Sequence, residues 1–279
     1  MPFVTTPNKD LLRKKFDLDA VEDHFKKKGK RLAYFGLPGP QILDILEWRK
    51  YLGTVMAVER DLYAKHFMRS KAFSMGFNQS NFQILFGDID DIILKGEDSD
   101  GTKLREEAFD VINLDYEGGL VYKDLVGDSK RVKAIKRLFD LQQASKRDFL
   151  LLLTVNTRNR DWGEFNKTLD QIQGQLEEYN VENIADNIDW YKSAGYAYKI
   201  KVYLPVHLGI WASSTSFSCS EAKAVMYLGS GNRRMVHFAC SFVYGEPKLG
   251  QSLIRILSIP MYEAEGGKIE IAKMQPPTV

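Results

Sequence analysis

Three acidic residues stand at the ends of apolar runs in the 279-residue sequence. Glu59 follows the run Thr54–Val58, while Asp88 and Asp115 close two later runs, NFQILFGD and FDVINLD. A carboxylate accepts hydrogen bonds from hydroxyl and amine groups. An acid at the end of an apolar strand also lowers stability unless a partner satisfies it or a ligand uses it. We therefore take these three residues as candidates for ligand binding.

Two of the three acids have a second interpretation. Glu59 stands beside Arg60 and Asp61, and Asp88 is followed by two further aspartates, so either could be an acid at the start of a helix. Such residues accept hydrogen bonds from the first backbone amides of the helix. Both interpretations stay open at this point.

A turn rich in glycine and proline lies between two apolar runs. It follows Leu32–Phe35 and contains Gly36, Pro38, Gly39 and Pro40. A segment with apolar residues at helical spacing joins it to the run that ends at Glu59; these residues are Ile42, Leu43, Leu46 and Leu52. Strand, helix and strand in this order form a right-handed βαβ unit, so the turn and Glu59 should meet at the carboxyl edge of a parallel sheet.

The chemistry of this edge suits a nucleoside. Glycine lets the backbone approach a ligand, a helix start offers free amides, and an acid there can accept both hydroxyls of a ribose. The Gly36-x-x-Gly39 spacing is neither the dinucleotide fingerprint nor a phosphate loop. A plain Rossmann-like turn without a ligand is therefore the alternative.

The rest of the sequence predicts alternating strands and helices. We expect helices over 8–29, 61–75, 130–146 and 162–179, and strands over 81–88, 109–115 and 148–156. Residues 222–245 predict an antiparallel hairpin around a Gly-Ser-Gly-Asn turn. The stretch 196–214 contains Pro205, which argues against a central strand, and we predict a helix there.

Composition indicates an ordinary soluble chain. The net charge is +2, and no apolar run reaches the roughly 18 residues needed to span a membrane. The N-terminus has no apolar export segment, so we expect a cytoplasmic protein with no membrane partner. Cys219 and Cys240 form neither a zinc pattern nor a disulfide framework and should be buried free thiols. The four histidines share no ligand spacing, so we expect no metal site, and His237 should be a satisfied core histidine.

Taken in order, five βα units, a terminal hairpin, the glycine turn and the three strand-ending acids resemble the class I S-adenosylmethionine-dependent methyltransferases. The resemblance covers residues 31–245. It implies an α/β, Rossmann-like fold with a mostly parallel sheet, a C-terminal antiparallel hairpin and helices on both faces. The organisation that we expect is a helical lead-in over 1–30, a methyltransferase-like domain over 31–262 with a helical insertion at about 180–215, and a partly ordered tail over 263–279.

The resemblance also implies S-adenosyl-L-methionine as cofactor and the residues that hold it. The glycine turn would face the methionine part, Glu59 would hold the ribose hydroxyls, and Asp88 would bond the adenine amino group. The candidate catalytic residues, where methyl donor and acceptor would meet, are Asn113, Asp115 and Tyr116. The full set of implied cofactor positions is Gly36, Pro38, Gly39, Glu59, Arg60, Asp88, Ile89 and Asp115.

Two departures from the family pattern leave other functions open. Amine-modifying members carry prolines after the fourth strand, where this chain has Asp115-Tyr116-Glu117-Gly118-Gly119. The run from Tyr34 to Gly39 lacks the acid that ends the first strand in the family and meets the cofactor's ammonium group. One alternative is a degenerate methyltransferase fold kept as a binding or assembly subunit. Another is a nicotinamide-linked oxidoreductase, although the terminal hairpin counts against it.

Basic residues recur in the segments where the family builds its substrate face: Lys123, Arg158, Arg160, Arg233 and Arg234. Tyr116, Tyr122 and Trp162 lie near them in the sequence. Cations interleaved with aromatic rings suit RNA or single-stranded DNA, because phosphates bind the cations and bases stack on the rings. We therefore predict methyl transfer to a nucleic acid, with solvated loops as the alternative for these residues. A protein partner or a homodimer is also open.

Overall fold

A nine-stranded sheet runs through the part of the chain that the structure describes. The computed structural model describes residues 6–104, 108–116, 129–157, 166–167, 169–170, 173–174, 177, 184–246 and 249–272. The strand order is β3-β2-β1-β4-β5-β7-β6-β8-β9. The bounds are β1 Leu32–Gly36, β2 Leu52–Glu59, β3 Phe82–Phe86, β4 Val111–Asp115, β5 Phe149–Asn156, β6 Phe217–Leu228, β7 Arg234–Tyr244, β8 Met261–Glu265 and β9 Lys268–Ile271.

Strands β1 to β5 are parallel to one another, and β7 is antiparallel to both β5 and β6. This arrangement confirms the predicted Rossmann-like, class I methyltransferase fold with its antiparallel hairpin. The register places Gly36 beside Asn113 and Asp115 beside Thr154. The carboxyl ends of β1 to β4 therefore lie next to one another, which brings the predicted ligand-binding acids to one edge.

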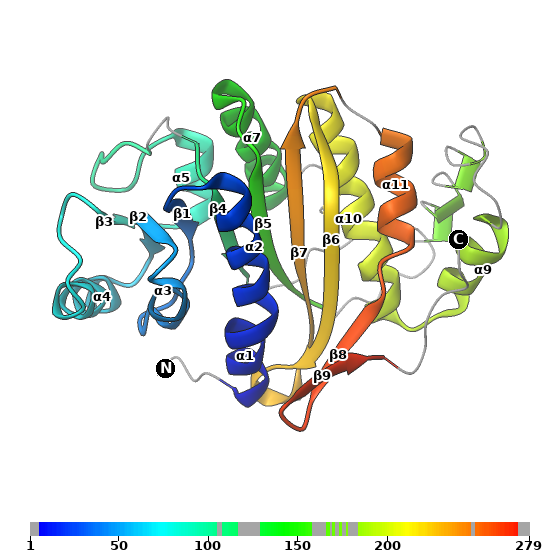
Figure 1. Ribbon diagram of the computed structural model, residues 1–279, viewed down its shortest axis with the longest axis horizontal. Coiled ribbons are helices and arrows are strands. Elements are labelled where there is room, and N and C mark those ends of the chain that lie inside the picture. Colours follow the sequence, from blue (N-terminus) through cyan, green and yellow to red (C-terminus); the bar gives the residue numbers. More distant parts are fainter. Residues whose placement is uncertain are drawn as a thin grey trace.

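Helices cover both faces of the sheet (Figure 1). One face packs against α1 Pro7–Leu11, the π-helix η1 Leu12–Asp17, α2 Leu18–Lys28, α3 Leu43–Trp48 and α4 Leu62–Ser74. The other packs against α5 Ile89–Lys95, α7 Lys130–Ser145, α9 Ile184–Ser193, α10 Tyr196–Ser214 and α11 Leu249–Leu257. Two buried apolar clusters, one on each face, hold these layers on the sheet. In Figure 1, α2 crosses in front of β5, while α10 and α11 lie on the far side of β6.

Several sequence predictions are confirmed at the level of elements. The stretch 196–214 is the helix α10 with Pro205 inside it, and residues 222–245 lie in the β6–β7 hairpin. Cys219 and Cys240 are buried and free.

Within the described residues, no helix combines the length and the apolar character needed to cross a membrane.

The helix after the glycine turn is shorter than the apolar spacing suggested. Leu52 is the first residue of β2 and not part of the helix, because α3 ends at Trp48. Ile42 stands just before α3 with a left-handed backbone (φ 44°), which is an uncommon conformation for a β-branched residue. Its side chain is fully buried, so packing holds the turn in this conformation.

The C-terminal strands β8 and β9 were not predicted. The expected domain boundary at residue 262 falls inside β8, which pairs with β6 and so belongs to the sheet. The two strands are short, and β9 is largely exposed, so neither forms a long apolar run. The sequence feature that could have predicted this pair of strands is Gly266-Gly267. Both glycines have positive φ and form the two-residue turn between β8 and β9, a type of turn that favours glycine pairs.

Gly36 allows β1 to approach β4. A Cβ atom built on it would lie 2.1 Å from the carbonyl oxygen of Asn113, whereas one built on Gly245, at nearly the same φ (+151° against +155°), would meet open space. We expect Gly36→Ala to lower the free energy of unfolding by about 1–3 kcal/mol more than Gly245→Ala, which carries the backbone strain alone. Urea denaturation of both variants measures this difference, and equal losses would mean that the contact is easily relieved.

Candidate functional site

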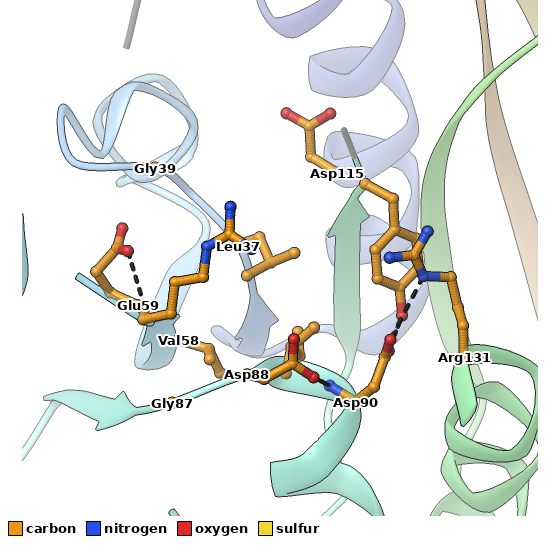
Figure 2. A pocket seen from close by; sticks show the side chains of 12 residues that line it. Leu37, Gly39, Val58, Glu59, Gly87, Asp88, Asp90, Asp115 and Arg131 are labelled. Atoms are coloured by element: carbon orange, nitrogen blue, oxygen red, sulfur yellow. Dashed lines mark hydrogen bonds and ion pairs between the residues drawn. The ribbon is translucent and has the colours of Figure 1, made fainter. Parts of the chain in front are cut away.

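A cavity of about 210 Å³ opens at the carboxyl ends of β1 to β4. Figure 2 shows Glu59, Asp88 and Asp115 around it. Its lining combines apolar residues with four carboxylates and two arginines: Leu37, Gly39, Val58, Glu59, Arg60, Gly87, Asp88, Ile89, Asp90, Asp115, Tyr116 and Arg131. Six of the eight predicted cofactor positions thus line one cavity, and the two others, Gly36 and Pro38, do not.

Glu59 ends β2 at one side of the cavity. Its Oε1 accepts hydrogen bonds from the backbone amides of Arg60 and Asp61, at 2.8 and 2.9 Å, just before α4 begins. Among the described residues, no protein donor contacts Oε2. Glu59 is therefore a helix-start acid, as one interpretation of the sequence had it, and it keeps one oxygen available for a ligand.

Asp88, like Glu59, accepts hydrogen bonds from described residues through only one of its two carboxylate oxygens. It is the N-cap of α5, and its Oδ1 accepts from the amides of Asp90 and Asp91 and from Lys130 Nζ at 3.0 Å. Burial raises the pKa of Asp88, but the bonds from Lys130 and the two amides outweigh it, so the pKa is lowered and the group is a carboxylate at neutral pH. Its Oδ2 has no donor within the described ranges. Ile89, at the first helical position, carries an amide for which the helix itself offers no acceptor.

The glycine turn reaches the cavity through two of its residues. Gly39, with φ +67°, and Leu37 line it. Gly36 instead packs on the backbone of Asn113, and Leu37 N donates to Asn113 O at 2.9 Å. The close β1–β4 contact thus moves Gly36 out of the cavity wall. The run from Tyr34 to Gly39, which spans the end of β1 and the start of the turn, contains no acid.

The three candidate catalytic residues do not share one environment. Tyr116 is buried in the cavity wall; its hydroxyl donates to Asp90 Oδ1 at 2.7 Å, and the Arg131 guanidinium lies 3.9 Å from its ring centroid. Tyr116 therefore does not offer a free ring to an acceptor in this structure. Asn113 lies outside this cavity and donates to Asp44 at 2.9 Å.

A second, smaller cavity of about 20 Å³ lies under the N-terminal helices. Its lining is mostly charged or polar: Lys9, Leu12, Arg13, Asp17, Asp44, Asn113, Asp115, Thr154, Tyr227 and His237. Among the described residues, Asp115 alone is common to the linings of the two cavities. It ends β4, its side chain is 14% exposed, and its Oδ2 forms an ion pair with Lys9 of α1. Asp115 therefore stands at the boundary between the two cavities.

The π-helix η1 supplies two charged side chains to the second cavity. Arg13 and Asp17, four residues apart, are both buried against the sheet. Arg13 forms ion pairs with Asp44 and with Asp10. Burial raises the pKa of Asp44, and the Arg13 guanidinium opposes that rise. This part of the site was missed in the sequence because its partners come from separate elements.

His237 joins η1 to the sheet. Its Nε2 lies 2.6 Å from Asp17 Oδ1, and its Nδ1 lies 2.8 Å from Thr154 Oγ1. The prediction of a satisfied core histidine is confirmed. Burial lowers the pKa of His237, but the Asp17 carboxylate more than offsets this, so the pKa is raised above 6.5.

Because the folded pKa of His237 is raised, the protonated pair stabilises the fold below about pH 6.5, and this contribution is lost as the pH rises through the folded pKa. We expect the free energy of unfolding to fall over this range by about 1.4 kcal/mol for each unit by which the pKa is raised. Asp17→Asn should flatten this dependence, whereas His66→Asn, at an exposed histidine of α4, should leave it unchanged. Urea denaturation from pH 6 to 9 measures it. A dependence that survives in Asp17→Asn would assign it to other groups.

The predicted substrate-binding cations are only partly described. Arg233 and Arg234 are exposed in the β6–β7 turn, and Arg234 O accepts from the amide of Thr157 at 3.1 Å, just after β5. This turn lies at the sheet edge that carries Asp115. Lys123, Arg158 and Arg160, like Tyr122 and Trp162, lie outside the described residues.

Other lining residues were not predicted. Asp90 and Arg131 face each other across the cavity wall, with Arg131 Nε 3.4 Å from Asp90 Oδ2. The amphipathic pattern of residues 130–146 located α7 but gave no reason to single out one of its basic residues. Within the described parts of the chain, no group of three or more histidine, cysteine or acidic residues could hold a metal ion.

Comparisons with known proteins give one family match and several likenesses of fold. A family model described as PP_RS20740-like matches residues 6–189. No curated protein matches the sequence. The solved structures that resemble this chain include TYW2 of M. jannaschii in complex with AdoMet, at 12% identity and a TM-score of 0.41 over 81% of this chain and 76% of that one.

Two further solved structures are similar to the same extent. Sp1610 of Streptococcus pneumoniae, in complex with S-adenosyl-L-methionine, has 11% identity and a TM-score of 0.42, covering 87% of this chain and 79% of that one. Cofactor-bound Rv0187 from MTB has 10% identity and a TM-score of 0.44, covering 88% and 84%. The strand order of this chain, rather than these distant likenesses, assigns its fold.

Proposed function

We propose that this chain, which belongs to the PP_RS20740-like family, is an S-adenosylmethionine-dependent methyltransferase. One observation carries the proposal. Glu59 ends β2 and Asp88 follows the neighbouring strand β3 in a class I methyltransferase sheet. Both line one cavity, and each keeps a carboxylate oxygen to which no described residue donates. Two such oxygens suit the hydroxyl and amine donors of an adenosine.

The residues present fit the adenosine part of this cofactor. Glu59 would accept from the ribose hydroxyls. Asp88 would accept from the adenine amino group, while the Ile89 amide would donate to the ring, since its position in α5 leaves it without an intrahelical acceptor. Val58, Leu37 and Ile89 supply apolar surface to the same cavity.

The chain's own residues would mainly align the reactants. When bound, S-adenosylmethionine supplies a methyl group on a positively charged sulfur. Asp115 stands at the boundary of the two cavities, where donor and acceptor would meet, and Asn113 holds the turn after β1 through its carbonyl. Correct placement of an acceptor alone accounts for much of the rate of such a transfer. No covalent bond to the protein is required.

The acceptor that we propose is a nucleic acid, RNA or single-stranded DNA. Arg233 and Arg234 support this, because they are exposed at the sheet edge that carries Asp115. A filter-binding measurement with single-stranded oligonucleotides tests the proposal. We expect the affinity of Arg233→Ala/Arg234→Ala to fall and its salt dependence to become shallower. Binding that does not change would remove the hairpin turn from the acceptor surface.

Calorimetric titration of the purified protein with S-adenosylmethionine and S-adenosylhomocysteine tests the cofactor, with NADH as the control ligand. Saturable micromolar binding of the first two supports the methyltransferase. The lack of an acid in the run from Tyr34 to Gly39 favours a second candidate, a methyltransferase fold kept as a binding subunit. That candidate gains support if neither ligand binds up to millimolar concentration, and NADH binding alone would favour an oxidoreductase.

A further inference from the structure

The N-terminal helix α1 brings a cation to the edge of the cavity. Lys9 forms its ion pair with Asp115, the residue shared by the two cavities. Both side chains are largely withdrawn from water, at 26% and 14% exposure. Burial lowers the pKa of Lys9, but the Asp115 carboxylate outweighs it and the pKa is raised, so Lys9 is a cation at neutral pH. Asp115 thus lines the larger cavity, and Lys9, which lines the second cavity, holds a positive charge against it.

This ion pair lies at the other end of the cavity from the adenosine-type groups. Asp88 and Asp115 line the same cavity from the ends of β3 and β4, and Figure 2 shows them well apart, with Leu37 between them in this view. A ligand with its base at Asp88 and its ribose at Glu59 would therefore extend past Leu37 towards Asp115. The group at that end of S-adenosylmethionine is an amino acid, with one ammonium and one carboxylate.

The other acid near the turn already has partners within the protein. Asp44 follows the turn and is buried, but it is engaged by Arg13 and accepts from Asn113, and it does not line the larger cavity. Leu37 offers no charge. Among the described residues, Asp115 is therefore the carboxylate best placed to replace the acid that is missing after β1.

We propose that Lys9 and Asp115 together bind the amino-acid end of the cofactor, Asp115 meeting its ammonium group and Lys9 its carboxylate. This inference rests on the proposed function and makes the N-terminal helix part of the cofactor site. Insertion of a zwitterion exchanges one ion pair for two, so no charge is left unpaired when the ligand binds. The arrangement also explains how this chain could do without an acid after β1.

The test compares two ligands that differ in the amino-acid end. S-adenosylhomocysteine carries it, and 5′-methylthioadenosine lacks it. Calorimetric titration should show that Lys9→Met and Asp115→Asn each weaken binding of S-adenosylhomocysteine by about 10- to 100-fold, the usual effect of losing a charge-assisted hydrogen bond. Binding of 5′-methylthioadenosine should change less than about threefold. Lys14→Met, at an exposed lysine in η1, is the matched control and should change neither affinity.

The outcomes separate the two proposals. If the wild-type protein binds neither ligand, the proposed function fails, and this inference falls with it. If the wild type binds both and the variants weaken both equally, Lys9 and Asp115 only hold α1 in place and the inference is wrong. Unchanged affinities overturn it as well. Should a variant fail to fold, the wild type alone decides, because equal affinities for the two ligands would show that the amino-acid end is not recognised.

Discussion

Glu59→Gln should weaken binding of S-adenosylhomocysteine by about 100-fold while the protein stays folded. The carboxylate would accept from two ribose hydroxyls, and charge-assisted hydrogen bonds of this kind are about twice as strong as neutral ones. Glutamine keeps one acceptor oxygen but turns an amide donor towards a hydroxyl. Its remaining oxygen can still accept from the amides of Arg60 and Asp61, so the start of α4 is preserved.

The matched control is Glu47→Gln, at a glutamate of α3 that does not line the cavity. Calorimetric titration gives the affinities, and thermal denaturation without ligand checks that both variants fold equally well. If Glu59→Gln binds the ligand as tightly as the wild type, Glu59 serves only as a helix-start acid, and the assignment of the ribose to this strand end is wrong.

The sheet and its ligand edge could be predicted because their signals are local. A buried parallel strand is a short apolar run, and a polar residue where it stops reports the carboxyl edge of the sheet. Glu59, Asp88 and Asp115 each follow such a run, and all three line the cavity. For Glu59 and Asp88, the helix-start and ligand-binding interpretations coexist, because one carboxylate has two oxygens.

The polar cluster under α1 and η1 could not be predicted in the same way. Lys9 and Asp115, or Asp17 and His237, are far apart in the sequence, and no local pattern relates them. Two of the buried residues of η1, Arg13 and Asp17, are charged, and a pattern of apolar residues does not reveal buried charges. The lead-in over 1–30 was predicted to be helical, but its charged contacts appear only in three dimensions.

Arg13→Met should lower the free energy of unfolding at pH 7 by about 3–5 kcal/mol, because it leaves the carboxylate of Asp44 buried without its cation. Met matches the apolar length of the arginine side chain, so packing against the sheet is largely kept. Asn113 would still donate to Asp44, but one neutral amide does not replace a guanidinium. Arg69→Met, at an exposed arginine of α4, should change stability by less than about 0.5 kcal/mol.

The pH dependence of the stability lost in Arg13→Met shows whether the loss comes from an unpaired buried charge or from lost packing. Burial raises the pKa of Asp44 and Arg13 opposes that rise, so removing Arg13 raises the pKa further. When the pKa of a carboxyl group is higher in the folded protein than in the unfolded one, the group favours folding most at pH values below its unfolded pKa. This contribution to the free energy of unfolding is lost as the pH rises through the folded pKa. The cost of Arg13→Met should therefore shrink near pH 4, and the added substitution Asp44→Asn should restore much of the stability at pH 7. A loss that is the same at both pH values, and is not rescued by Asp44→Asn, would assign the effect to packing of the arginine side chain.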